Sequence, residues 1–205
     1  MVCSGDFGNI NIKMDDNGLK QVPKFKYLGS IITEDGKNKE DIIQRIKEAK
    51  VMFNNKVQLL WWNNLSLEMK RIIIKSCIWS VALYGSETWT IGKNGERIIN
   101  AFETRCWRRM LKIKWTDRIT KDEVFQRAKE GRLLLKILKN RCHSWIGHTI
   151  RHNKFVVNIL EGAIFGKKAV GRPQLKYFKQ VASYTAMKRM ACNNSRWKAS
   201  NQSKD

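Results

Sequence analysis

The spacing of apolar residues changes near Asn38, and this change most constrains the fold. Before it, residues 9–14 alternate, Asp15-Asp16-Asn17-Gly18 suits a tight turn, and residues 25–32 are rich in strand formers. After it, apolar residues recur at intervals of three and four, as on one face of a helix. The chain is therefore predicted to be mainly α-helical, with a short antiparallel β-hairpin at its start.

Three amphipathic helices are predicted between Asn38 and Ile113, forming a three-helix bundle. The first has Asn38 as its cap, the second begins near Ser66 and stops at Gly85, and the third follows Asn94-Gly95. Their predicted packing positions are Ile42, Ile43, Ile46, Ala49 and Phe53; then Met69, Ile72, Ile73, Cys77 and Val81; then Ile98, Ile99, Phe102, Cys106, Met110 and Ile113.

A basic helical extension is predicted after this bundle. Thr120 is expected to cap a short helix that ends at Lys129, and a long helix follows Gly131. The packing side of the long helix is expected to hold Leu134, Leu135, Leu138, Cys142, Trp145, Ile146 and Thr149. A last helix is expected over residues 174–190. The predicted parts are 1–36 (hairpin), 37–115 (three helices), 116–190 (basic helical region) and 191–205 (polar tail).

Charge points to a polyanionic partner. The chain has 40 Lys and Arg residues against 18 Asp and Glu, a net charge of +22. Residues 1–40 hold six basic and six acidic side chains, so the whole excess lies beyond them. Such an excess carries a self-repulsion that a bound polyanion would relieve, which favours DNA or an RNA/DNA hybrid as the partner.

Two cationic helix faces are the candidate contact surfaces. The third predicted helix carries one stripe, and the long helix and the residue before it carry a second. A merely solvated face is the alternative for either stripe. The residues of the first stripe are Arg105, Arg108, Arg109 and Lys112, and those of the second are Arg132, Lys136 and Lys139, with His143 beside them.

Other patterns suggest where the protein works. Residues 1–13 lack a cationic start followed by an apolar run, and no apolar run approaches about eighteen residues, so neither secretion nor membrane spanning is expected. The five cysteines, Cys3, Cys77, Cys106, Cys142 and Cys192, show no paired spacing. We therefore expect reduced thiols in an intracellular protein, nuclear or cytoplasmic.

Cys142-His143 together with His148 and His152 raises the possibility of a zinc site, because His148 and His152 are spaced i, i+4 on one helix. The set lacks a second ligand pair at finger spacing, so surface histidines near phosphate are preferred. Trp61-Trp62 is expected in the loop between the first two helices, with one ring packed and the other able to stack on a base or sugar.

Five segments in order resemble the carboxy-terminal part of LINE-type, non-LTR retrotransposon endonuclease/reverse transcriptases, which are RNA-directed DNA polymerases. The resemblance covers nearly the whole chain and implies the thumb and post-thumb regions. The segments are Val22 to Thr33, Ser80 to Trp89, Trp107 to Leu111 with Trp115 to Ile119, Ser144 to His148, and Gly171-Arg172-Pro173.

The segment Phe25-Lys26-Tyr27-Leu28-Gly29 is similar to the primer grip of that family, which steadies the growing DNA end. The residues themselves agree, because Gly29 permits close backbone approach and Lys24 and Lys26 alternate outward toward phosphate. Ordinary sheet packing remains the alternative for Phe25, Tyr27 and Leu28. Arg172 joins the candidate nucleic-acid contacts.

Catalysis by the family uses Mg²⁺ ions held by palm aspartates on two separate strands, and these are not expected here. Asp15-Asp16 is interpreted as a hairpin turn, with too few residues before it for a palm. By the resemblance, Met1 is an internal methionine of a longer element, whose palm is then a further partner. The isolated chain is not expected to be an enzyme, to need a cofactor or to hold a metal.

Two alternatives to a nucleic-acid-binding fragment of a reverse transcriptase remain. One is a decayed transposon remnant without function, and the other is a retained sequence-specific DNA-binding regulator.

Overall fold

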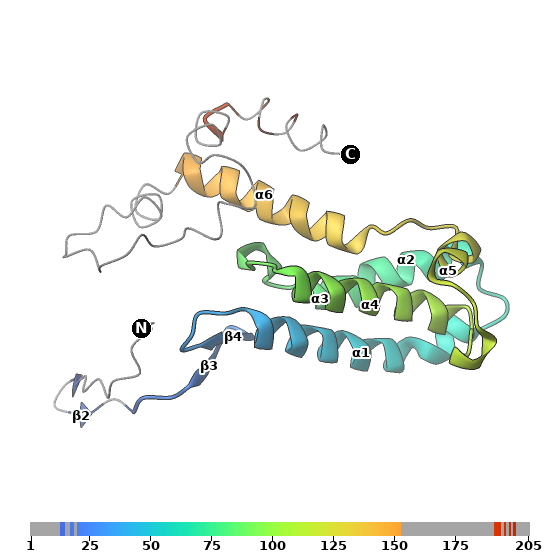
Figure 1. Ribbon diagram of the computed structural model, residues 1–205, viewed down its shortest axis with the longest axis horizontal. Coiled ribbons are helices and arrows are strands. Elements are labelled where there is room, and N and C mark those ends of the chain that lie inside the picture. The colour runs from blue at the N-terminus through green and yellow to red at the C-terminus, as the bar shows by residue number, and fades with distance from the viewer. Residues whose placement is uncertain are drawn as a thin grey trace. The chain divides into compact units, whose positions relative to one another are not determined.

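The computed structural model of the protein describes residues 13–14, 17–18, 20–152, 191–193, 195, 197 and 199. The chain divides into two compact units. The first holds residues up to Gly85 together with Ile91–Leu134, and the second holds Ser86–Thr90 together with the chain from Leu135 onward. The described chain is mainly helical and has antiparallel hairpin structure before its helices, as predicted (Figure 1). It holds two such hairpins among the described residues, where one was expected.

Two separate hairpins precede the helices. Strand β1 (Lys13–Met14) pairs with β2 (Asn17–Gly18), and β3 (Lys24–Tyr27) pairs with β4 (Ser30–Thr33), both antiparallel. Leu28 and Gly29 form the turn of the second hairpin with φ of 47° and 85°. Positive φ at both central residues is what a two-residue type I′ turn needs. Strand β3 thus ends at Tyr27, and Leu28 and Gly29 form the turn that follows it.

The second hairpin is anchored to the first helix, α1 (Lys39–Trp61). The backbone N–H of Ile31 donates to Oδ1 of Asp41 at 2.9 Å. Behind the turn lies the buried guanidinium of Arg45, which pairs with Glu48 at 3.0 Å and lies 4.5 Å from the ring centroid of Tyr84. The hairpin therefore has a fixed attachment to the amino-terminal end of α1.

Helix α1 buries the predicted side, with Ile42, Ile46, Ala49 and Phe53 each at most 5% exposed. Asn38 stands at the N-cap position, as predicted, but its side chain makes no capping hydrogen bond. Ser66 does cap the next helix, α2 (Leu67–Ile73), by accepting from the N–H of Met69 at 3.3 Å. Gly85 ends this helical stretch with a φ of 67°.

The packing side predicted for the second helix is wrong. Helix α2 runs into a π-helical segment, η1 (Ile74–Ile78), and then α3 (Trp79–Ala82). Met69 and Ile72 are about half exposed, whereas Ile74, Ile78 and Trp79 are buried. A π turn holds one residue more than an α turn, which shifts the buried side relative to a 3.6-residue period.

Two tryptophans form the centre of the first unit. Trp79 of α3 and Trp107 of α4 (Lys93–Met110) meet edge to face, with ring centroids 5.6 Å apart. Both are almost fully buried, and α1 packs against both α3 and α4 (Figure 1). Aromatic pairs of this geometry are favourable beyond the area that they bury.

The first unit closes with η3 (Trp115–Asp117) and α5 (Lys121–Ala128), which packs on α4. Thr120 caps α5 as predicted, accepting from the N–H of Glu123 at 3.3 Å. After α5, the carboxylate of Glu130 accepts from Nζ of Lys75 at 2.6 Å. Because the Glu130 side chain is only 7% exposed, this ion pair joins η1 firmly to the end of α5.

The second unit is built on α6, which spans Leu134–His152. Its Cys142 thiol donates to the carbonyl of Ser86, in the short η2 (Ser86–Thr88), and burial raises the pKa of that thiol to about 11. The indole of Trp197 stacks on the ring of His143 at 3.9 Å and donates to the His143 carbonyl. Cys77, Cys106, Cys142 and Cys192 are free thiols. Cys3 and the helix predicted over residues 174–190 lie outside the described residues.

The buried Arg45 predicts an unequal response at two glycines with positive φ. A Cβ at Gly29 would lie 2.9 Å from Nη2 of Arg45, whereas one at Gly36 (φ 63°) would meet nothing within 4 Å. Gly36→Ala should cost about 1 kcal/mol of unfolding free energy from backbone strain. Gly29→Ala should cost at least about 1 kcal/mol more, because the guanidinium must move. Urea denaturation checks this, and equal losses would contradict the packing described here.

Candidate nucleic-acid interface

A basic groove of about 810 Å³ runs along α4 and is the candidate interface. We call it the α4 groove. Four of its residues are arginines of α4, one near the start of the helix and three in its second half. Two further cations come from the first residue of α5 and from the segment after α5. The lining residues are Arg97, Asn100, Ala101, Thr104, Arg105, Arg108, Arg109, Ile113, Lys121 and Arg132.

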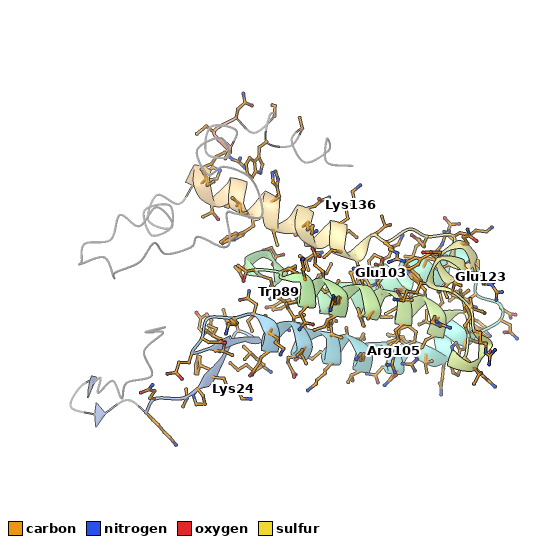
Figure 2. The ribbon with its side chains drawn as sticks, viewed as in Figure 1. Lys24, Trp89, Glu103, Arg105, Glu123 and Lys136 are labelled. Atoms are coloured by element: carbon orange, nitrogen blue, oxygen red, sulfur yellow. The ribbon has the colours of Figure 1, made fainter. Side chains whose placement is uncertain are left out.

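The spacing of α4 explains why one helix both packs and presents cations. Arg97, Ala101, Arg105 and Arg108 are separated by four, four and three residues, so they share one face of the helix. The buried face of α4 holds Phe102, Cys106, Trp107 and Met110. Arg105 projects from α4 in Figure 2.

The other side of the groove comes from outside α4. Lys121 is the first residue of α5, and Arg132 lies between α5 and α6. Arg132 is held by Asp122, with Nη2 to Oδ1 at 3.0 Å, and its guanidinium lies 5.4 Å from the ring centroid of Phe125. Helix α5 thus positions both cations across from the arginines of α4.

Glu103 fixes the chain next to Arg132. Its side chain is fully buried, and Oε1 accepts from the N–H groups of Leu133 and Leu134 at 2.9 and 3.1 Å. Burial raises the pKa of Glu103, while the two amides and the charge of Arg132 act in the opposite direction. The carboxylate accordingly ties residues 133–134 to α4. Figure 2 labels the Glu103 side chain.

The charge of the groove is largely uncompensated. Among the described residues that line it, six are Arg or Lys and none is acidic. Arg97, Arg105, Arg108 and Lys121 make no ion pair within the described part of the chain, whereas Arg132 pairs with Asp122. Arg109 is committed to packing, because its Nη1 donates to Oδ1 of Asn54 at 2.7 Å and its guanidinium lies 4.7 Å from the Phe53 ring centroid.

The groove brings together four of the predicted contact residues, Arg105, Arg108, Arg109 and Arg132. Lys112 lies outside it, with Nζ 6.0 Å from the ring centroid of Trp61. Lys24 lies on β3 and pairs with Glu40 at 3.7 Å. Lys136 and Lys139 are exposed on α6, in the second unit, and Arg172 lies outside the described residues.

Two of the six cations that line the groove, Arg97 and Lys121, were not predicted as contacts. Arg97 lies eight residues before Arg105, and extending the helical spacing backward would have found it. Lys121 could not be found this way, because only the packing of α5 on α4 brings it to the groove.

Strand β3 and the turn after it are strongly exposed. Phe25, Tyr27 and Leu28 are 54%, 57% and 75% exposed, so ordinary sheet packing does not account for them within the described chain. Lys24 and Lys26 are exposed as well.

Within the ranges that the structure describes, no group of three or more His, Cys, Asp or Glu side chains could hold a metal ion. The rings of His148 and His152 do lie close, with centroids 4.7 Å apart. Asp15 and Asp16 lie outside the described residues. None of the described helices is both long enough and apolar enough to cross a bilayer.

Comparison with known proteins gave no relatives: no protein-family model, no curated protein and no solved structure matches this chain.

The buried carboxylate predicts a pH effect on stability. A carboxyl whose pKa is raised by folding contributes stability below its usual value of 4.5, and loses that contribution as the pH rises through the folded pKa. Glu103→Gln keeps an acceptor for the two amides without the charge. Between mildly acidic and neutral pH, the unfolding free energy of the variant should therefore fall less than that of the wild-type protein. Urea denaturation across that range checks it, and an identical pH profile for both proteins would refute the effect.

Proposed function

We propose that the chain binds the phosphate backbone of DNA or of an RNA/DNA hybrid in the α4 groove. One observation carries this proposal: six cations line one concave surface that no described acidic residue shares. Like charges held together repel one another, and binding to phosphates removes that repulsion while releasing counterions from the nucleic acid.

The length of the cationic face suits a polymeric anion. Arg97 and Arg108 are eleven residues apart on one helix, a rise of about 16 Å. Each strand of a duplex carries one charge per roughly 3.4 Å of its axis, so this face matches several successive phosphates. Contacts to phosphate carry little sequence information, and low sequence preference is expected.

We further propose that the chain acts as the thumb-side part of a retroelement reverse transcriptase. The ordered resemblance of five segments to LINE-type enzymes supports this, as does the helical region that follows an exposed hairpin. The exposed Phe25, Tyr27 and Leu28 suit docking against the palm of a longer polymerase or against the primer end. In this proposal the Mg²⁺ ions and the catalytic aspartates belong to that palm.

Removing cations from the groove should lower the affinity for nucleic acid and make that affinity less dependent on salt. If about six to eight phosphates are engaged, log affinity should fall with log salt at a slope of roughly −5 to −7. Arg105→Ala with Arg108→Ala should make the slope shallower by about two units and lower affinity at moderate salt by about tenfold or more.

The matched control removes two exposed cations of α1, by Lys47→Ala with Lys56→Ala. It changes net charge equally and should leave the slope near the wild-type value. Filter binding to a short duplex over a salt series measures both. An affinity independent of salt, or equal losses in the two double variants, would overturn the groove as the binding site.

A second measurement addresses catalysis. The purified chain with Mg²⁺, a primed template and nucleotides should extend no primer, because the proposal assigns the metal-binding aspartates to a palm outside it. A reverse transcriptase run alongside shows that the assay works. Extension by the chain alone would contradict this assignment.

A further inference from the structure

Two adjacent tryptophans lie exposed where α1 ends. Trp61, the last residue of α1, is 42% exposed, and Trp62, its C-cap, is 57% exposed. An indole can bury a large apolar area, so leaving two of them in contact with water forgoes much hydrophobic stabilisation. Exposed aromatic rings of this kind suit a ligand with flat apolar faces.

Trp61 connects this pair to a residue that lines the α4 groove. Nε1 of Trp61 donates to the backbone carbonyl of Arg109 at 2.8 Å, and Arg109 lines the groove. The ends of α1 and α4 lie side by side in Figure 1. Lys112 is exposed beside Trp61, with Nζ 6.0 Å from the ring centroid. A polymer leaving the groove past Arg109 therefore meets two indoles and a further cation.

The two rings have different roles. Trp61 is held by its hydrogen bond to α4 and positions the end of α1. The Trp62 side chain makes no hydrogen bond or ring contact within the described part of the chain. Its backbone is nevertheless fixed, because its N–H donates to the carbonyl of Leu59 and its carbonyl accepts from the N–H of Leu65. Trp62 is thus a free ring on an ordered support.

We propose that Trp62 stacks on an unpaired base of a nucleic acid whose backbone lies in the α4 groove, with Lys112 at the adjoining phosphate. This inference rests on the proposed function and names the form of its ligand, a duplex that carries a single-stranded extension. Bases inside a duplex already stack on one another, so only an unpaired or terminal base offers its face to an indole. The surrounding cations favour this occupant over an apolar protein surface.

The test compares two probes with equal numbers of phosphates, a blunt duplex and a shorter duplex with a single-stranded overhang. The wild-type chain should bind the overhang probe roughly five- to a hundredfold more tightly, the range for one stacked base. Trp62→Ala should abolish this preference and leave affinity for the blunt duplex unchanged. Trp62→Phe should retain part of it, because phenylalanine also offers a stacking face.

The control variant is Met69→Ala, which removes another exposed apolar side chain, from α2, and should change neither affinity. Equal binding of both probes by the wild-type chain would overturn the inference and leave the proposed function standing. The inference would also be overturned if Trp62→Ala lowered the affinity for both probes by the same factor. An unchanged preference for the overhang probe in Trp62→Ala would overturn it as well. If neither probe binds, both the inference and the proposed function fail.

Discussion

The arrangement of the candidate interface depends on the carboxylate of Glu103. This fully buried group accepts two backbone N–H groups, from Leu133 and Leu134, and so holds the chain after α5 against α4. Arg132 is the residue next to this attachment. Burying a charged carboxylate is costly, which is why the pKa of Glu103 is raised. The two amides offset part of that cost by donating hydrogen bonds to the carboxylate. The carboxylate in turn gives each amide an acceptor that it would otherwise lack.

Around this attachment, the structure separates cations that hold the fold from cations that remain available. Arg45 lies buried beneath the hairpin, Lys75 pairs with the largely buried Glu130, and Arg109 binds Asn54. Arg105 and Arg108 have no comparable commitment within the described chain. Position in the fold, rather than the total charge of +22, therefore identifies the side chains suited to phosphate.

Much of the local structure could be predicted from spacing. The change to a helical period near Asn38, the start of a helix near Ser66, the cap at Thr120 and the buried side of α1 follow from short-range rules, and all are present. The stripe on α4 was predicted for the same reason. Side chains three and four residues apart on a helix share a face whatever surrounds them.

The failures have physical causes. The π segment η1 rotates the packing side away from Ile72, and no helical period anticipates that extra residue. Glu103 lies within an apolar stripe, where a charged residue is not expected without its partners, and those partners lie thirty residues further along the chain. Lys121, which was not predicted as a contact, reaches the groove only through the packing of α5 on α4. A hairpin turn that places Leu28 at positive φ departs from the usual preference for Gly, Asn or Asp.

The most direct test of the central claim follows the arginine side chains themselves. In a ¹⁵N NMR titration with a short DNA duplex, the Nε–Hε signals of Arg97, Arg105, Arg108 and Arg132 should shift together and saturate at one affinity. The signal of Arg127, which is exposed on α5 and pairs with Glu123 at 2.7 Å, serves as the internal reference and should stay in place. Unmoved groove arginines in the presence of bound duplex, or shifts as large at Arg127, would contradict the α4 groove as the nucleic-acid interface.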